Sequence, residues 1–555
     1  MGELIKKSGI EKRSGVSAED ISFIYSLFGM SDAESIVGLA EHIEGDVLLK
    51  KIFKLNGTPT DINNKVIDNF LIGMGLEKGN VLNDELIKAL QTDIRTKSVE
   101  DGVVIGDDTT IIKTGKKMEN ISIVHDHSND TYGWGYCLPT THYADDEKNY
   151  PLFFDFRIKS DEEKKVAEEE KLRKNLKIDK RSSKDIIKWL DYQIANGNTP
   201  DVVDLRGSFF NANAVNEMKT RSVNWVGVSP KNRKYKIAGK WVCVGKITSG
   251  VDESVYTLLE DDGHHRVIIK KGEMNGVGEV NLMIVNNIDE DITNLYVTEH
   301  GNDKKSIDLL TAVLNKEREC DETKLKLMLE QLARTRECGV VAENTTFDRW
   351  FYAVWFINAV LELGYRRVVI KTKKNIIYIY DEKEMTAGEV GKTIPPEEYA
   401  YHKTENIRTA SRVVYQEGIG NVKLVFVEEL NNQGKVAQAY SLMCTDPDCE
   451  DIKVFHIHKK RWPIETFYRE LKQNHGLNDF HMRKFNGIRA HVLFVFISFI
   501  ILTVLSLFNP RLLEKTLGWI KRQYINALVK IKETDEGIMV RFTKAFIEDY
   551  GLPMI

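Results

Sequence analysis

The sequence predicts a mixed α/β protein, of the α+β kind with a mixed sheet, and three observations support this class. Strand-like stretches rich in β-branched and aromatic residues follow one another over residues 103–158. Helical apolar periodicity marks the first hundred residues and several later segments. With 555 residues, 42% of them apolar and 29% charged, the chain is long enough for several domains and a large core.

The first hundred residues are predicted to form a helical N-terminal domain, for which DNA binding is one candidate role. Ser31 and Glu34 have capping-box spacing ahead of the apolar stretch "SIVGLAEHI". The segment "NDELIKALQTDI" (83–94) repeats apolar residues at helical spacing.

Two adjacent acids, Asp107 and Asp108, stand between the apolar runs "VVI" and "IIK". They are predicted to end one strand and precede another, and a polar turn is the plain alternative to a site. Neighbouring residues of a strand point to opposite faces, so only one of the two acids can face a given site.

Charge and cysteine usage limit the function classes. The net charge is −5, so a nucleic-acid surface must be local. Residues 456–491 supply one, because they hold eight Lys/Arg against three Asp/Glu. The six cysteines form no C-x-x-C pair, and the N-terminus has no apolar signal stretch, which together predict a cytoplasmic protein. No P-loop motif indicates an ATP-driven step.

An apolar run at 492–508, "VLFVFISFIILTVLSLF", has the composition of a membrane span but only 17 residues. Because a span needs about 20 residues, the run is predicted to be a buried core helix, and no membrane partner is expected.

An approximate internal repeat runs through the middle of the chain. Residues 199–235 align with 343–378, 278–285 align with 420–427, and 306–320 align with 451–465. An internal duplication is therefore predicted, in which Asp204 and Asp348 correspond and Cys320 stands where the second copy has Glu465.

The segment "KKRWPIETFYRELKQNHG" (459–476) is predicted to form a helix that starts near Trp462, because Pro463 is tolerated only in the first turn. Helical spacing puts Glu465, Arg469 and Lys472 on one face. A carboxylate among cations suits a divalent metal held beside phosphates. The alternative is a surface ion pair between Glu465 and Arg469.

Three segments, in order, resemble prokaryotic insertion-sequence transposases of the DDE class. "GDDTT…KTGKKMENIS" resembles the region of their first acid, and "FDRWF…LELGYRRVVIKTKKN" is similar to that of the second. "HKKRWPIETFYRELKQNHGL" resembles the signature helix of a subgroup with a Tyr-x2-Arg-x3-Glu-x6-Lys pattern. The pattern falls on His458, Arg461, Glu465 and Lys472, with His458 in place of the tyrosine.

The resemblance implies a ribonuclease-H-like core in which Asp108, a second aspartate and Glu465 hold Mg²⁺, for which Mn²⁺ can substitute. It also implies a β-rich insertion ahead of the glutamate helix. His458, Arg461, Arg469 and Lys472 are expected to contact double-stranded DNA, namely the terminal inverted repeats of an element and its target. Two or more subunits are expected to hold the two element ends.

The second aspartate is left open between Asp348 and Asp204. Asp204 lies closer to Asp108 in sequence, but the flanks of Asp348 fit the family pattern better, and Asp348 shares a repeat copy with Glu465. Asp348 is the preferred assignment.

The predicted function is metal-dependent cleavage and strand transfer of DNA at the ends of an insertion sequence. Two alternatives stay open: a nuclease on the same core without strand transfer, and a domesticated, non-catalytic DNA-binding descendant. The predicted segments are the N-terminal domain (1–100), the first part of the core with the first repeat copy (101–235), the β-rich remainder of that copy (236–322), the second copy (323–375), the β-rich insertion (376–450), the glutamate helix with the following core helix (451–510) and a C-terminal helical segment (511–555).

Overall fold

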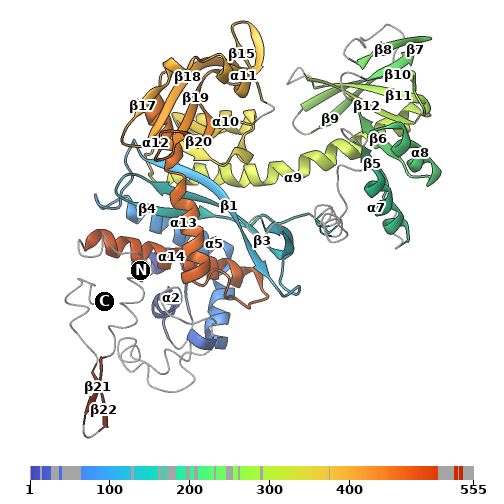
Figure 1. Cartoon of the computed structure of the whole chain (residues 1–555). Coiled ribbons are helices and arrows are strands. Elements are labelled where there is room, and N and C mark those ends of the chain that lie inside the picture. Colours follow the sequence, from blue (N-terminus) through green and yellow to red (C-terminus); the bar gives the residue numbers. More distant parts are fainter. Residues whose placement is uncertain are drawn as a thin grey trace. The chain divides into compact units, whose positions relative to one another are not determined.

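The computed structural model divides the chain into two compact units, and each is described by itself (Figure 1). Unit 1 comprises residues 1–159 and 324–555, and unit 2 comprises residues 160–323. The structure describes residues 2–12, 16–26, 37–39, 64–126, 131–160, 164, 167–168, 171, 183–195, 200–205, 210–229, 233–244, 254–260, 263–287, 292–299, 301–373, 376–509, 530–534 and 537–541.

Unit 1 is built on a large mixed sheet. Its central strand β1 (Val103–Lys113) pairs antiparallel with β3 (Thr131–Ala144) and parallel with β13 (Asn344–Phe347), which in turn pairs parallel with β14 (Arg367–Lys371). Strands β2 (Ser122–Asp126) and β4 (Asn149–Phe154) both pair with β3. A mixed sheet of this kind is consistent with a ribonuclease-H-like core.

β1 differs from the sequence prediction in one respect. It runs without a break through Asp107 and Asp108, whereas two strands flanking the acid pair were expected. The continuous pairing of β1 with β3 explains the difference, because every residue from Val103 to Lys113 has a partner on that strand.

The sheet continues beyond β14 through antiparallel strands. β20 (Val436–Cys444) pairs with β14, and the order then runs through β19, β18, β15 and β16. The segment predicted as a β-rich insertion is therefore rich in strands, and these strands extend the same sheet. They are β15 (Ile377–Tyr380), β16 (Lys383–Thr386), β17 (Ala400–His402), β18 (Ile407–Gln416) and β19 (Gly420–Leu430), with the short helices α11 (Ala387–Lys392) and η5 (Pro396–Glu398) among them.

Helices cover this sheet and carry the candidate site. α12 (Asp451–Lys459) contacts β13, β14 and the strands β18 to β20. α13 (Trp462–Asn474) contacts β1 and α14 (Phe485–Phe508). The short helix η4 (Arg349–Phe351) and α10 (Val354–Glu362) connect β13 to β14. Within unit 1, the C-terminal part of α9 (Asp303–Glu337) also packs on β1, since Met328 meets the backbone at Gly106.

The described N-terminal residues are helical, as predicted, and belong to unit 1. They form α1 (Gly2–Lys7), α2 (Ala18–Ser26) and α5 (Asn64–Leu90), which is kinked at Gly75 (φ 69°), whereas Ser31 and Glu34 lie outside the described residues. α2 and α5 both pack on α14. The Tyr25 hydroxyl lies 2.8 Å from His491 Nδ1, which ties α2 to α14.

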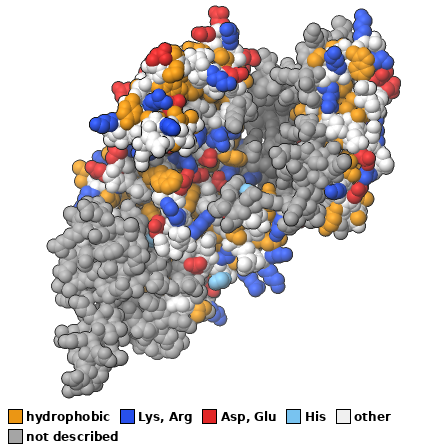
Figure 2. Space-filling model, in the orientation of Figure 1, with side chains coloured by type: hydrophobic (Ala, Val, Ile, Leu, Met, Phe, Trp, Pro, Cys, Tyr) orange, Lys and Arg blue, Asp and Glu red, His pale blue; other side chains and the backbone are white. Residues whose placement is uncertain are grey.

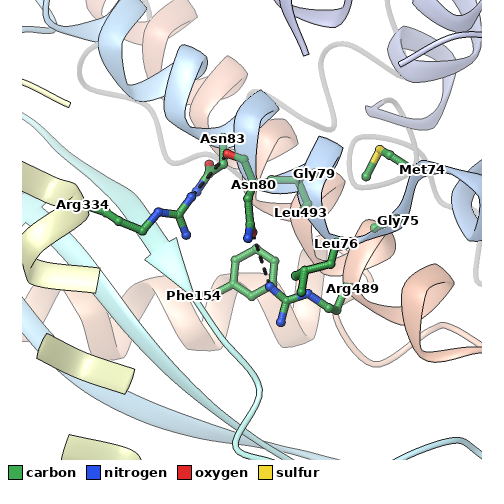
Figure 3. A pocket seen from close by; sticks show the side chains of 11 residues that line it. Met74, Gly75, Leu76, Gly79, Asn80, Asn83, Phe154, Arg334, Arg489 and Leu493 are labelled. Carbon is green, nitrogen blue, oxygen red and sulfur yellow. Dashed lines mark hydrogen bonds between the residues drawn. The ribbon is translucent and has the colours of Figure 1, made fainter. Parts of the chain in front are cut away.

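A small pocket marks the meeting point of α5, β4 and α14 (Figure 3). Arg489 of α14 donates to the side chain of Asn80 at 3.5 Å, and Arg334 of α9 donates to the Asn80 carbonyl at 3.3 Å. Phe154 lies beside Arg489 in the pocket wall (Figure 3), with its ring centre 5.9 Å from the guanidinium carbon. These contacts hold the N-terminal helices to the sheet of unit 1.

α14 is longer than the predicted apolar run, with 24 residues rather than 17. By length and composition alone it qualifies as a membrane span, and 61% of its most apolar window is buried inside the protein. Most of its side chains pack into the core of unit 1, which is the environment predicted for a core helix.

Unit 2 holds a second sheet, of the order β5-β6-β12-β11-β10-β7-β8, with β9 paired to β10. Its elements are α7 (Ser183–Ala195), β5 (Val203–Leu205), α8 (Ala212–Thr220), β6 (Trp225–Val228), β7 (Lys234–Ile237), β8 (Lys240–Cys243), β9 (Ser254–Glu260), β10 (Gly263–Met274), β11 (Gly278–Asn287) and β12 (Ile292–Glu299).

This sheet repeats, strand for strand, the order β13-β14-β20-β19-β18-β15-β16 of unit 1, in which β17 pairs with β18 as β9 does with β10. α8 and α10 occupy equivalent places and are displaced by 142 positions at both ends. The side chain of Asn216 donates to the Gly276 carbonyl at 2.9 Å, and Asn358 donates to the Gly418 carbonyl at 2.7 Å, again 142 positions on. The two glycines share a left-handed backbone, with φ values of 76° and 77°.

Two predicted segments differ from the structure. The boundary predicted at 235/236 falls inside β7 of unit 2, whereas the one at 322/323 lies beside the junction between the two units. The described part of the segment 511–555, predicted to be helical, is a hairpin of β21 (Lys530–Thr534) and β22 (Gly537–Arg541). Alternation in "KIKET" and "GIMVR" around a short turn has the period of strands, which explains the hairpin.

Candidate active site

The parallel pairing of β1 and β13 brings two acids next to each other. Gly106 and Phe347 are register partners, and Asp107 and Asp348 are the next residues of the two chain segments. A Cβ on Gly106 would meet the Phe347 ring at 2.5 Å, so glycine allows this ring to pack against β1. Asp348 thus directly follows β13, the strand that pairs with β1 and its two acids.

Asp107 and Asp108 point to opposite faces of β1, as strand geometry requires. Asp107 Oδ2 accepts a hydrogen bond from Arg461 Nη1 at 3.1 Å, on the face covered by α13. Asp108 Oδ1 lies 2.6 Å from Lys324 Nζ of α9, and its other oxygen accepts from the Cys137 thiol at 3.3 Å. The structure therefore turns Asp107 toward the glutamate helix and holds Asp108, the acid predicted from the resemblance, against α9.

α13 presents Glu465 as the sequence predicts. The helix begins at Trp462 with Pro463 in its first turn. Its inner face is buried through Ile464, Phe467 and Leu471, which fixes the rotation of the helix on the core. Glu465 lies in the first turn, where the helix dipole favours its ionised form.

Arg461 joins the two carboxylates that face each other here. Its guanidinium forms ion pairs with Asp107 and, through Nη2, with Glu465 four residues later. The predicted surface pair between Glu465 and Arg469 is replaced by this contact. Burial raises the pKa of Asp107 to about 7, the Arg461 charge opposes that rise, and the charges of Asp108 and Asp348 add to it. Two acids thus converge on one positive charge.

Asp348 adds a third carboxylate on the same side of β1. It precedes η4 as the N-cap residue, yet its side chain makes no capping hydrogen bond. Burial lowers the pKa of Lys371, with the charges of Arg349 and Arg461 adding to the effect and that of Asp348 opposing it. Asp348 therefore lies within electrostatic range of both Asp107 and Lys371.

The donor chemistry of this site suits a hard cation, because carboxylate oxygens are the ligands that Mg²⁺ prefers. Within the described residues, no three His, Cys, Asp or Glu side chains are close enough to hold one ion together. The guanidinium of Arg461 is the cation that Asp107 and Glu465 share. The residues fit a divalent metal in kind, and Arg461 stands between two of them.

Asp204, the rival second aspartate, lies in unit 2. It is exposed and sits in the middle of β5, paired with Val226, whereas Asp348 follows the end of β13. The displacement of 142 shared by α8 and α10 puts Asp204 opposite Thr346 rather than Asp348. The sequence alignment displaces the two copies by 144 positions, two more than the displacement of α8 and α10 in the structure.

The predicted DNA-contacting residues have unequal surroundings. Arg469 is exposed on α13. Burial lowers the pKa of Lys472, and the charge of Asp126 opposes the shift. Burial and the charges of Arg461 and Lys371 lower the pKa of His458 to about 3, so this residue is neutral at physiological pH. Of the four predicted DNA-contacting residues, Arg461, Arg469 and Lys472 are therefore the cations.

A groove of roughly 900 Å³ lies beside the acids. Three cations and two exposed or half-buried rings line it, together with four carboxylates: Lys459, Lys460, Arg461, Tyr440, Trp462, Asp145, Asp146, Glu405 and Glu429. Trp462 is 61% exposed.

Sequence reasoning missed two residues, one at this site and one on the opposite face of β1. The first is Asp107, although strand alternation had signalled that only one of the adjacent acids could face Glu465. The second is Lys324, whose ammonium lies 4.2 Å from the centre of the Trp350 ring as well as beside Asp108. No motif marked Lys324, since its partner is distant in sequence.

Comparison with known proteins agrees with this geometry in one region. No curated protein sequence matches the chain. Residues 297–501 match the family model described as "Transposase DDE domain". The matched span contains Asp348 and Glu465, and it excludes Asp204 as well as Asp107 and Asp108. This region of the chain is thus similar to a transposase DDE domain, which supports a DDE transposase.

Proposed function

We propose that the chain is a DDE transposase that cleaves DNA at the ends of an insertion sequence and transfers the cut strand to a target. The observation that carries the proposal is the meeting of Asp107 and Glu465 on Arg461, with Asp348 alongside. Of these residues, Asp348, Arg461 and Glu465 lie in the region similar to a transposase DDE domain. In-line displacement at a phosphodiester needs neutralisation of charge on the attacking and leaving oxygens. Carboxylates beside cations supply the groups for this task.

Asp107, Asp348 and Glu465 are proposed to hold Mg²⁺, for which Mn²⁺ can substitute. When bound, the metal would activate a water or a DNA 3′-hydroxyl and stabilise the leaving oxygen. The resemblance gave the role of the first acid to Asp108, which the geometry pairs with Lys324 instead. The two assignments predict opposite effects of Asp107→Asn and Asp108→Asn on DNA cleavage.

The cations of the site are proposed to bind and orient DNA. Arg461 lines the groove beside Asp107, so the same guanidinium that balances the acids can meet a backbone phosphate. Lys459 and Lys460 line the same groove, and Arg469 and Lys472 lie further along α13. Trp462 offers an exposed ring to a sugar or base.

The finer assignment is to the subgroup with the Tyr-Arg-Glu-Lys signature helix, with His458 in place of the tyrosine. We infer that the chain contains an internal duplication. Its support is the common strand order of the two sheets and the displacement of 142 positions shared by α8 and α10. The strands of 376–450 correspond to a β-rich insertion of the family. Two or more subunits would hold the two element ends, and the cytoplasm is the proposed location.

The test uses the full chain and the DNA that flanks its coding sequence, since this DNA would contain the element ends. Purified protein with Mg²⁺ is expected to nick the flanking DNA at defined positions and to join the ends to a target plasmid. Defined cleavage without joining would favour a nuclease on the same core. Binding without cleavage, unaffected by Glu465→Gln, would favour a non-catalytic descendant.

A further inference from the structure

A second cationic stretch belongs to unit 2. Residues 219–246 contain eight Lys/Arg and no Asp or Glu, a higher density of positive charge than the window around α13. The described part of this stretch comprises the end of α8, β6 and the β7–β8 hairpin. Lys and Arg side chains are visible at the end of unit 2 where Figure 1 labels β7 and β8 (Figure 2).

One face of the hairpin combines cations with an aromatic ring. Lys236 and Trp241 are register partners across the two strands, so their side chains lie on the same face. Lys234 lies two residues before Lys236 and shares that face, because side chains alternate along a strand. Tyr235, on the opposite face, is fully buried, which leaves the lysine face outward. Trp241 is 51% exposed and Lys234 is exposed.

The equivalent hairpin of unit 1 provides an internal comparison. β15–β16 has the same register, with Ile379 opposite Glu384 where β7–β8 has Lys236 opposite Trp241. Both hairpins turn through two residues with positive φ, 47° and 78° in the first and 48° and 61° in the second. The backbone is common to the two hairpins, so their side chains can be compared position by position.

The two hairpins differ in the charge of their side chains. Residues 234–243 contain three lysines and no acid, whereas residues 377–386 contain one lysine and three acids. The registers align the hairpins at a displacement of 143 positions, one more than for α8 and α10, so Lys234 and Lys236 correspond to Ile377 and Ile379, and Trp241 corresponds to Glu384. The fold of the hairpin does not require the cations or the tryptophan, because the other hairpin forms without them.

We propose that the Lys234–Lys236–Trp241 face of the β7–β8 hairpin binds DNA, with the lysines on backbone phosphates and Trp241 against a base or sugar. The inference rests on the proposed function in taking DNA as the substrate, and it adds a contact outside the catalytic unit. Ammonium groups beside an exposed aromatic ring are the combination that binds a nucleic-acid strand. Lys236 also pairs with Glu273 at 3.0 Å, so Lys234 is the freer phosphate contact.

The test exchanges side chains between the two hairpins. Lys234→Ile and Trp241→Glu install residues that the β15–β16 hairpin already carries, so both variants are expected to fold. Lys383→Ala is the matched control, because Lys383 is an exposed lysine of the other hairpin and corresponds to Lys240. Affinity is measured by fluorescence anisotropy with 30-nucleotide duplex and single-stranded DNA over a series of salt concentrations.

Lys234→Ile should lower the slope of log K against log salt by about 0.9 on duplex DNA. Trp241→Glu should weaken binding about tenfold or more, with the larger effect on single-stranded DNA if the ring meets a base. Unchanged affinity and slope in both variants, with wild-type protein binding DNA, would overturn the inference. So would an equal loss in Lys383→Ala.

Cleavage assays on the same proteins separate this inference from the proposed function. The hairpin variants should keep wild-type cleavage rates at saturating DNA, whereas Glu465→Gln should bind normally and not cleave. If the wild-type protein cleaves DNA and the hairpin variants bind DNA as tightly as the wild type, the inference alone is refuted. If the hairpin variants lose DNA affinity and the wild-type protein does not cleave DNA, the proposed function alone is refuted.

Discussion

Gly106 of β1 and Phe347 of β13 lie opposite each other in a parallel pair, and this register puts an aspartate next to each of them on the same edge of the site. Asp348 is therefore the predicted second catalytic acid. Asp348→Asn should reduce cleavage by about 10²-fold or more, while DNA affinity stays near wild type. Asp204→Asn is the matched control, because Asp204 lies in β5 of unit 2, and it should retain most activity. The reverse pattern would move the second acid to unit 2.

The adjacent acids give a second prediction. Asp107→Asn should abolish cleavage, because Asp107 shares Arg461 with Glu465. Asp108→Asn should retain activity once the loss of stability that this substitution causes is removed. That loss arises because Lys324 would be left with little solvent and without its partner. The double variant Asp108→Asn with Lys324→Met removes the unpaired charge and is the control. An inactive but stable double variant would give the role to Asp108.

Lys472 is predicted to contact a phosphate. Lys472→Ala should weaken binding to element-end DNA and lower the salt slope by about 0.9. Lys484→Ala is the control from the same basic window, because its ammonium already pairs with Glu119 at 2.7 Å. Equal salt slopes for the two variants would assign Lys472 to a structural role.

His491 predicts a pH dependence of stability. Gly476 accepts a hydrogen bond from its Nε2 at 2.9 Å, so Nδ1 accepts from Tyr25 and the ring is neutral. Burial lowers the pKa of His491 to about 3. The unfolded chain binds the extra proton below about pH 6.5, so the folded state loses about 1.4 kcal/mol per pH unit from this group as pH falls from 6.5 toward 3.

Urea denaturation at pH 7 and pH 5 measures this effect. His491→Gln should be less stable at pH 7 and should lose less on going to pH 5 than the wild type. An equal loss in the wild type and His491→Gln would rule out His491 as the titrating group.

α14 gives the last prediction. Its side chains pack on α2, α5 and β4, so the protein should stay in the supernatant after carbonate extraction of disrupted cells. Recovery only with detergent would show that the helix spans a membrane instead.

Local signals predicted α13 well and the acid pair only in part. Pro463 and the spacing of Ile464, Phe467 and Leu471 are contained in one helix, so the sequence predicts its start and its buried face. The choice between Asp107 and Asp108 depends on which face of β1 receives α13 and which receives α9. Those helices are more than 200 residues away in sequence, so no local pattern carries the information.

The repeat shows the same limit at a different scale. Its existence is visible as similar strand–helix–strand texture, but the equivalence of Asp204 and Asp348 depends on where a strand ends. β5 contains Asp204, while β13 ends before Asp348. Hydrogen bonds such as Asn216 to Gly276 fix the displacement at 142, and they exist only in the folded chain.

The separation of β1 from β13 bears on how the protein is made. Val103 and Asn344 are partners although they are 241 positions apart, and unit 2 occupies most of that interval. At ribosomal speeds the interval takes on the order of 10 s or more to synthesise, ample time for unit 2 to fold first. β1 meanwhile presents an unpaired edge that another nascent chain can join. Chains that stop before residue 344 keep that edge permanently, so premature termination should yield aggregates rather than a dominant-negative, DNA-competent fragment.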